Sequence, residues 1–459
     1  MPRFRFALVF SCLAVLAPLC REVRAERAYD LTPNRLPTKA VRVEAQLEVG
    51  GDIKLVEEGK PRTLKMSVSA QLDYDERCVP VADSQQQHRR AVRFYSQAKA
   101  AIKIDEGSVE PVLRESRRLM VADEADGCVA LFCPTGPLTR EELDLVDIPA
   151  NSLLLDQLLP RQPVKIGEQW SHDRGLMAKL LGLDVVSQSD VKSQLKEVSG
   201  DRARLELAGH VLGAVGGVST EIEVKAKYRF DFHQHRVTGL GLLVKEERAI
   251  GLVNTGLDVV AKLQLALAPS EGDGELSDTA LAQLPLEPRP EFLALECQAP
   301  TKKFRIVHSR DWHLMTDAGD LLALRYLDRG ELVAQCNVSS LADVPPGKEP
   351  TLADFQHDLE RSLGKNFERF IEASEATNSL GHHIYRVIAE GRVSDLPIQW
   401  HYFLIADRAG HVAVFAFTVE SELADRLGDA DELLAATIEF APSRSARRPT
   451  TAGKPRTRK

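Results

Sequence analysis

Alternating hydrophobic and polar positions dominate residues 42–268 of the chain. The clearest run covers residues 222–232, where Ile, Val, Ala, Tyr and Phe fall on one side of an extended chain and charged residues on the other. Residues 43–49 and 64–72 repeat the alternation, and the Gly216-Gly217 pair suits a two-residue hairpin turn. Further strands are predicted over residues 112–122 and 184–198. Short turns between successive strands favour antiparallel pairing. We therefore predict one large antiparallel β domain.

A helix-type segment over residues 139–170 interrupts this alternation. Thr139, followed by Glu142, is typical of a capping box, and Pro149 ends the first predicted helix. A second helix is predicted over residues 151–159, before Pro160. We expect this insert to pack against the strands, with its leucines either filling a core or closing a cavity. No residue in the insert is assigned as a ligand contact.

The pattern changes after an acidic, Pro- and Gly-rich stretch at residues 269–291, which we interpret as a linker. In residues 292–440, the 351–363 segment has apolar residues at helical spacing, and a closing helix is predicted over 421–436. Residues 412–419 are almost continuously apolar, which is typical of a strand covered on both faces. The expected fold class is therefore α+β with two domains, the second an α/β/α sandwich.

The N-terminus has the pattern of a secretory signal peptide over residues 1–25. Arg3 and Arg5 precede an apolar stretch at residues 6–19, and small residues favour cleavage between Ala25 and Glu26. A membrane anchor and a lipoprotein cut before Cys20 are the alternatives, although the apolar stretch is short for a membrane span. We expect a secreted or periplasmic protein of a bacterial cell envelope, with no transmembrane segment in the mature chain.

Charge divides unevenly along the chain, whose formal net charge is −8. Four arginines and one glutamate give residues 1–25 a charge of +3, and seven basic residues give the 441–459 tail +7. Residues 26–440 therefore carry −18. This acidic body argues against nucleic-acid binding by the folded part. The basic tail is predicted to be disordered, and it could contact an anionic surface or an acidic partner.

Five cysteines remain after the predicted signal peptide, and an exported compartment permits disulfides. Cys128 and Cys133 are the candidate pair, because they flank a short segment, and either could instead pair with Cys78. An odd number leaves at least one thiol free or paired between chains. No Cys-x-x-Cys motif is present, so neither a thioredoxin-type site nor a zinc knuckle is indicated.

Histidines form the only candidate metal-binding patterns. His233 and His235 are expected on the polar face of a strand, among basic residues that oppose a bound cation. His382 and His383 are expected to face opposite sides of a strand, which separates them from a shared site with His401 and His411. His308 and His313 flank Trp312, which we interpret as a core anchor. We assign no metal ligand.

Common catalytic motifs are absent. The chain has no Gly-x-Ser-x-Gly, no His-Glu-x-x-His, and no phosphate loop in the glycine-rich residues 209–217. Glu141 and Glu142 are explained by the favourable position of carboxylates in a first helical turn. The sequence thus assigns no catalytic residue and no cofactor, although a site assembled from scattered residues stays open.

Residues 300–440 resemble the PsbP-like (Mog-type) α/β/α sandwich family. The features that carry the resemblance are Trp312 after a strand, the 351–363 helix, the strands of GHHIYRVIAEGR and IQWHYFLIADRAGHVAVFAFTVE, and the closing DADELLAATIEF. The resemblance implies a binding or scaffolding module without catalytic activity. The first domain is loosely similar to the half-barrels of periplasmic lipid carriers, at the level of fold alone.

These features predict an exported, non-enzymatic protein that binds a hydrophobic small molecule or a protein partner. A curved antiparallel sheet with a helical insert can enclose an apolar cavity. One alternative is a hydrolase with a scattered active site. Another is a structural protein of the envelope, tethered by its basic tail.

Overall fold

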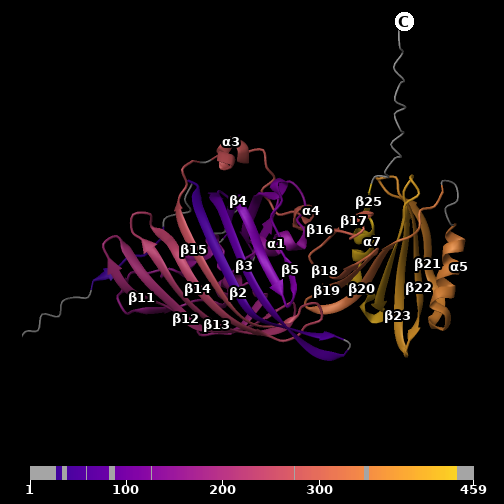
Figure 1. Cartoon of the computed structure of the whole chain (residues 1–459), viewed down its shortest axis with the longest axis horizontal. Helices are drawn as coiled ribbons and strands as arrows, with labels where there is room; N and C mark the ends of the chain where they lie inside the picture. The colour runs from indigo at the N-terminus through magenta and orange to yellow at the C-terminus, as the bar shows by residue number, and fades with distance from the viewer. Residues whose placement is uncertain are drawn as a thin grey trace, which may run out of the picture.

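The computed structural model describes residues 27–33, 39–57, 59–81, 88–125, 127–272, 274–345 and 351–441. Two β-rich bodies lie side by side (Figure 1), the first in indigo to pink and the second in orange to yellow. The predicted signal peptide, its Ala25–Glu26 cleavage site and residues 442–459 of the basic tail lie outside the described residues.

The first body is a curved antiparallel sheet of thirteen described strands. One half runs outward from β2 (Val41–Glu57) through β3 (Lys60–Val79), β4 (Arg89–Ile104), β6 (Leu119–Ala125) and β7 (Cys128–Phe132). The other half runs outward from β15 (Gly256–Pro269) through β14 (Arg236–Arg248), β13 (Val218–Asp231), β12 (Arg202–Val215), β11 (Lys192–Ser199) and β9 (Gln169–Ser171). The halves meet where β2 pairs with β15, and β5 (Gly107–Val109) and β10 (Val185–Ser189) add to β4 and β12.

Alternation in the sequence produces this sheet as predicted. In β13 the even-numbered residues from Ile222 to Phe230 are buried, while the charged residues between them face solvent. Gly216 and Gly217, with φ of 56° and 76°, form the tight turn between β12 and β13. A two-residue turn of this kind needs positive φ at both positions, which glycine adopts without strain. The predicted antiparallel domain is therefore confirmed.

The helical insert packs against one end of the concave side of the sheet. It contains α1 (Arg140–Val146), a 3-10 helix over Ser152–Leu158, and α2 (Arg174–Leu181), which begins beyond the predicted segment. The predicted capping box is present, because Glu142 N donates to Thr139 Oγ1 at 3.2 Å and Thr139 N donates to Glu142 Oε2 at 3.0 Å. The leucines of the 3-10 helix are buried in the main hydrophobic core, so this part of the insert fills the core.

A buried polar network attaches the insert to the sheet. Arg93 of β4 donates from Nε to Glu76 Oε2 at 2.8 Å and from Nη2 to Ser152 Oγ at 3.1 Å, and it also contacts Asn151. The Arg93 guanidinium lies 5.0 Å from the ring centroid of Tyr74. Since a buried charge needs compensating partners, these contacts fix the 3-10 helix on this part of the sheet.

The chain then crosses to the second body through short elements. They are a 3-10 helix at Gly274–Leu276, α3 (Asp278–Leu281) and α4 (Pro290–Leu293). A small sheet follows, in which β17 (Phe304–His308) lies between β16 (Leu295–Gln298) and β25 (Glu439–Phe440).

The second body is a seven-stranded antiparallel sheet with helices on both faces. Its strand order is β18 (Trp312–Ala318), β19 (Leu321–Asp328), β20 (Glu331–Ser340), β24 (Val412–Glu420), β23 (Leu396–Ala406), β22 (His383–Val393) and β21 (Phe367–Thr377). α5 (Leu352–Leu363) packs on one face, and α6 (Ala424–Leu427) and α7 (Ala430–Ala435) pack on the other. The predicted α+β fold class and α/β/α layering are confirmed.

Three local expectations are corrected. The closing helix is broken between α6 and α7, where Gly428 has φ of 57°, outside the helical region. The expected strand over residues 184–198 is two strands, because the chain breaks at Asp190 and Val191, against which Gly209 packs closely. Instead of the expected strand over 112–122, a 3-10 helix at Glu115–Arg117 precedes β6.

The candidate disulfide between Cys128 and Cys133 is not formed. All five cysteines in the described part of the chain are unpaired. Cys128 begins β7 and is exposed, whereas Cys133 follows the end of β7 and is buried. An extended strand advances about 3.3 Å per residue, so these two Cα atoms lie too far apart for a disulfide.

Contacts between the two bodies come from several elements. Arg310, after β17, donates from Nη2 to Leu131 O of β7 at 2.5 Å and from Nε to Leu293 O at 2.8 Å. Leu138 O accepts from Glu296 N at 2.8 Å. The β12–β13 turn also meets the β19–β20 turn, since a side chain at Gly217 would lie 2.8 Å from Gly330 O.

Among the described helices, none has the length and apolar character needed to cross a membrane.

Candidate functional site

Cross-strand register places three rows of small and apolar residues on the concave face of the sheet. Residues directly opposite each other in an antiparallel pair share a face. The first row contains Leu263, Leu47, Ala70 and Ala100, the second contains Ala261, Val49, Val68, Ile102 and Val109, and the third contains Val259, Gly51, Met66 and Ile104. The rows thus form a continuous apolar surface across β15, β2, β3, β4 and β5.

The helical insert covers only one end of this surface. Along β2, Val43 and Ala45 are fully buried, whereas Leu47 and Val49 are partly exposed. The same change occurs along β3, where Leu72 is buried and Val68 is not. The apolar face therefore continues beyond the residues that cover it.

A cavity of about 700 Å³ occupies the place where the cover ends. Its floor is the concave face of β2, β3 and β4, one wall is α1, and the other is the segment over residues 109–114. Two of its lining residues, Val109 and Val112, are 60% and 63% exposed. Leu145 and Ile148 complete the apolar lining from the side of α1. Volumes of this size are typical of pockets for small molecules.

Polar residues gather at the rim. Arg114 donates to Glu142 from Nε and Nη2, each at 2.5 Å, and pairs through Nη1 with Glu296. Although burial favours the protonated carboxyl, hydrogen bonds from Arg114 and Thr139 lower the pKa of Glu142 below its usual value. The Glu142 carboxylate therefore stays charged at neutral pH and holds Arg114 in place.

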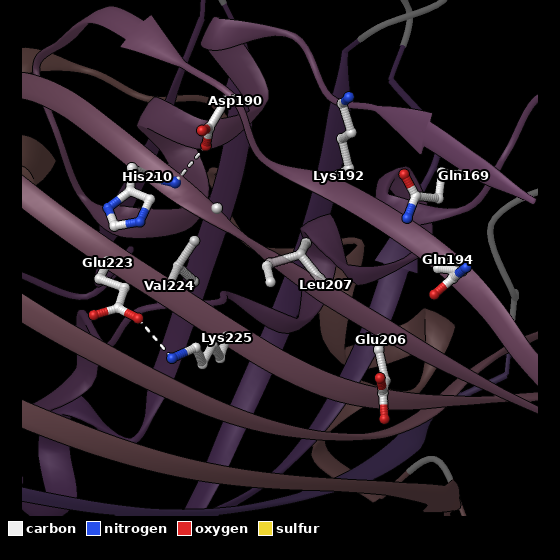
Figure 2. A pocket seen from close by; sticks show the side chains of 12 residues that line it. Gln169, Asp190, Lys192, Gln194, Glu206, Leu207, His210, Glu223, Val224 and Lys225 are labelled. Carbon is white, nitrogen blue, oxygen red and sulfur yellow. Dashed lines mark hydrogen bonds and ion pairs between the residues drawn. The ribbon is translucent and has the colours of Figure 1, made fainter. Parts of the chain in front are cut away.

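Two further hollows lie elsewhere on the molecule. One, of about 410 Å³, lies between the two bodies and includes Cys297, His308 and Trp312. The other is a groove of about 450 Å³ on the solvent-facing side of β11, β12 and β13 (Figure 2). In this groove His210 N donates to Asp190 at 2.6 Å and Lys225 pairs with Glu223 at 2.6 Å. Two of its charged side chains, Glu223 and Lys225, thus compensate each other, and Asp190 borders the groove at the break between β10 and β11.

Neither candidate histidine pair forms a metal site. We expected His233 and His235 on the polar face of β13, but they lie in the turn after this strand. His233 Nε2 lies 2.9 Å from Asp201 Oδ2. These histidines leave the strand because β13 ends at Asp231, whose carboxylate accepts hydrogen bonds from the backbone amides of His233 and Gln234. The described residues contain no group of three or more His, Cys, Asp or Glu placed to hold a metal ion.

The remaining histidines have separate partners. His401 Nδ1 lies 2.7 Å from Asp431 Oδ2 in the buried contact between β23 and α7. His383 lies 3.3 Å from Glu375, and His411 lies 2.8 Å from Asp407. Trp312 is a buried anchor, only 3% exposed, as the sequence predicted.

One buried group of three hydrogen-bonded side chains was not predicted from the sequence. Tyr228 Oη donates to Ser193 Oγ at 2.8 Å, and His172 Nε2 lies 2.7 Å from the same oxygen. A Ser–His contact of this length resembles the pair of a hydrolase. Ser193 is, however, 0% exposed, so a substrate cannot reach its hydroxyl in this structure. No local signal marks the trio, because its members come from three separate segments.

Comparisons with known proteins give no family. No family model and no curated protein matches the chain. The solved structure of cyanobacterial PsbP from Synechocystis is 14% identical with a TM-score of 0.27, covering 32% of this chain and 92% of that one. A structure from Bacteroides thetaiotaomicron is 13% identical with a TM-score of 0.25, covering 32% and 48%. DynF, from the dynemicin biosynthesis pathway of Micromonospora chersina, is 5% identical with a TM-score of 0.17, covering 54% and 86%. These TM-scores are too low for any argument, so the PsbP-like resemblance stays a prediction.

Proposed function

We propose that the protein is an exported, non-enzymatic binding protein that holds an apolar small molecule in the cavity between α1 and the concave sheet. The observation that carries this proposal is the continuation of the first two apolar rows past the helical insert into a space of about 700 Å³. Apolar surface left uncovered inside a concavity is the usual property of a site for a hydrophobic ligand.

Burial of the ligand supplies the binding free energy. Removing about 300 Å² of apolar ligand surface from water stabilises a complex by roughly 7 kcal/mol at 25 cal/mol per Å². Lost translational and rotational freedom offsets part of this gain. The net gain is therefore smaller than about 7 kcal/mol, so we expect dissociation constants above about 10 μM, which suit a carrier that releases its ligand.

The second domain takes the role of a scaffold in this proposal. Its PsbP-like resemblance implies a binding or scaffolding module, and its β16 residue Glu296 pairs with Arg114 at the cavity rim. The signal-peptide pattern of residues 1–25 supports export to the periplasm or beyond.

A neutral fluorescent probe tests the proposal. We expect 1-N-phenylnaphthylamine to gain fluorescence on the full chain with saturable binding. Ala100→Phe should remove the gain, because Ala100 lines the cavity floor. The matched control is Ala101→Phe, the next residue along β4, whose side chain points to the opposite face.

Both variants are first checked for an unchanged circular dichroism spectrum, and Ala70→Phe serves as a second variant of the cavity floor. Absence of probe binding to the wild-type chain would contradict the proposal. Equal binding by wild type and a folded Ala100→Phe or Ala70→Phe variant would also contradict it.

A further inference from the structure

The wall that α1 presents to the cavity is half acidic and half apolar. Glu141, Asp144 and Leu145 of α1 line the cavity, at the spacing that places residues on one side of a helix, and Ile148, just after the end of α1, lines it too. An amphiphile whose tail contacts Leu145 and Ile148 would have its head group beside Glu141 and Asp144. The charge at the rim therefore decides which head group fits.

The rim has one cation, and that cation is already compensated. Arg114 is paired with both Glu142 and Glu296. These two carboxylates hold its guanidinium in directed hydrogen bonds, which a competing anion would have to displace. Arg114 is thus not free to neutralise a carboxylate or phosphate head group.

Carboxylates outnumber this cation. The cavity lining contains four of them: Glu110, Glu141, Glu142 and Asp144. Asp144 pairs with Arg140 at 3.0 Å, but neither Glu110 nor Glu141 has an ion-pair partner within the described part of the chain. Both are exposed at the opening, which gives the mouth of an apolar cavity two uncompensated negative charges.

We infer that the ligand of this cavity is a cationic amphiphile, with an apolar tail in the cavity and an ammonium-type head group between Glu110 and Glu141. This inference rests on the proposed function and specifies its ligand class. An anionic amphiphile such as a fatty acid carries the wrong sign, because it would add a negative charge to a rim that has no free cation. Charge complementarity selects the head group while the apolar rows bind the tail.

Three probes with the same ten-carbon tail test the ligand class: decyltrimethylammonium, decanol and decanoate. Each is titrated below its micelle concentration against the full chain, by displacement of 1-N-phenylnaphthylamine. Two carboxylates near one ammonium in water favour the cation by roughly tenfold over the anion. We expect decyltrimethylammonium to bind about tenfold more tightly than decanoate, with decanol between them. Because the mouth is exposed to solvent, this preference should fall towards twofold in 0.5 M salt.

A charge-neutralising variant locates the preference. Glu110→Gln combined with Glu141→Gln should reduce the cation preference to about twofold and leave decanol binding unchanged. The matched control is Glu44→Gln with Glu48→Gln, which removes the same charge from the outer face of β2 and should keep the preference.

The outcomes separate the two proposals. Decanoate binding as tightly as decyltrimethylammonium, while both displace the fluorescent probe, would overturn the ligand class and leave the cavity function standing. A preference that survives in the Glu110/Glu141 variant would also overturn it. A wild-type chain that binds neither the fluorescent probe nor any ten-carbon probe would contradict the proposed function itself.

Discussion

Arg93 is the largest fully buried side chain in the described structure, and its burial requires several partners at once. Its guanidinium contacts Glu76, Asn151 and Ser152, and Ser152 in turn donates to Glu76 at 2.7 Å. Two of these partners belong to the helical insert and one to β3. A single side chain therefore fixes where the insert sits, and indirectly where the covered part of the concave face ends.

Replacing Arg93 tests this role. Arg93→Met leaves the Glu76 carboxylate buried without its cation, so we expect the free energy of unfolding to fall by about 3–5 kcal/mol. Urea denaturation followed by tryptophan fluorescence measures the change. Arg62→Met, which removes an exposed partner of Glu57, should leave the free energy of unfolding nearly unchanged. An Arg93→Met chain as stable as wild type would show that the network is not needed.

A second residue-scale prediction concerns pH. Burial lowers the pKa of His172 to about 4 from an ordinary value near 6.5. The unfolded chain therefore binds a proton in the window between pH 6.5 and 4 that the folded chain does not bind. Stability should fall as pH drops through this window, by about 3 kcal/mol in total from this group.

His172→Gln should flatten that part of the stability curve, because the replacement does not titrate. Denaturant unfolding at half-unit pH steps measures both curves. His233→Gln is the control, since His233 is exposed in a turn. An unchanged slope in His172→Gln would assign the acid sensitivity to other groups.

In the second domain, the backbone of a short 3-10 helix approaches strand β22 closely at one glycine. A Cβ at Gly391 of β22 would lie 1.8 Å from Asn366 O, in the short 3-10 helix after α5. Trp400 lies on the other side, with its Cζ3 atom 3.1 Å from the same position. The close packing at the junction between α5 and β21 thus requires a residue without a side chain at position 391.

Gly391→Ala should destabilise the chain by about 1–3 kcal/mol, because the Asn366 backbone must move to admit the methyl group. Fluorescence of the neighbouring Trp400 during urea unfolding reports the loss. Gly50→Ala in β2 is the control, since a Cβ there meets no heavy atom within 4 Å. Equal stability of the two variants would show that the α5–β21 junction can shift freely.

At the scale of elements, the features predicted correctly from the sequence are those that depend on residues close together along the chain. The alternation in β13, the turn at Gly216-Gly217 and the Thr139–Glu142 capping box all depend on residues within one or two turns of each other, and all are confirmed. The incorrect predictions of strands and of the closing helix arise from tertiary contacts or from local backbone conformation. The strand break at Asp190 comes from the close approach of Gly209, which is distant in sequence.

The candidate cavity could not be predicted from the sequence for the same reason. Its floor depends on the register that places Leu47, Ala70 and Ala100 opposite one another, and its walls come from two segments outside these strands. The sequence did predict a concave sheet and an insert able to close a cavity. It named neither the lining residues nor the pairing of Arg114 with Glu142 and Glu296.

At the scale of the whole molecule, Arg310 connects the two bodies. Its guanidinium satisfies two backbone carbonyls, Leu131 O on the edge strand β7 and Leu293 O in α4. Burial lowers the pKa of Arg310 from its ordinary value, which reflects how far this contact is removed from solvent. Loss of the side chain would leave both carbonyls without this donor.

We expect Arg310→Ala to weaken the coupling between the domains by about 1–3 kcal/mol. In differential scanning calorimetry, its unfolding should separate into two transitions more widely than that of wild type. Arg329→Ala, which removes a side chain that is 92% exposed, should leave the calorimetric profile unchanged. Identical profiles for Arg310→Ala and wild type would place the coupling in other contacts.

The pairing of β2 with β15 has a consequence for how the chain acquires this structure. Each half of the curved sheet is largely built from neighbours in sequence, but the partners along this pair are more than 200 residues apart. Contacts of such high contact order carry a large loop-closure entropy and tend to form late in folding. Since the apolar rows run across this pair, we expect the chain to acquire its two half-sheets first. The apolar rows would then be complete across the whole concave face only in the final step of folding.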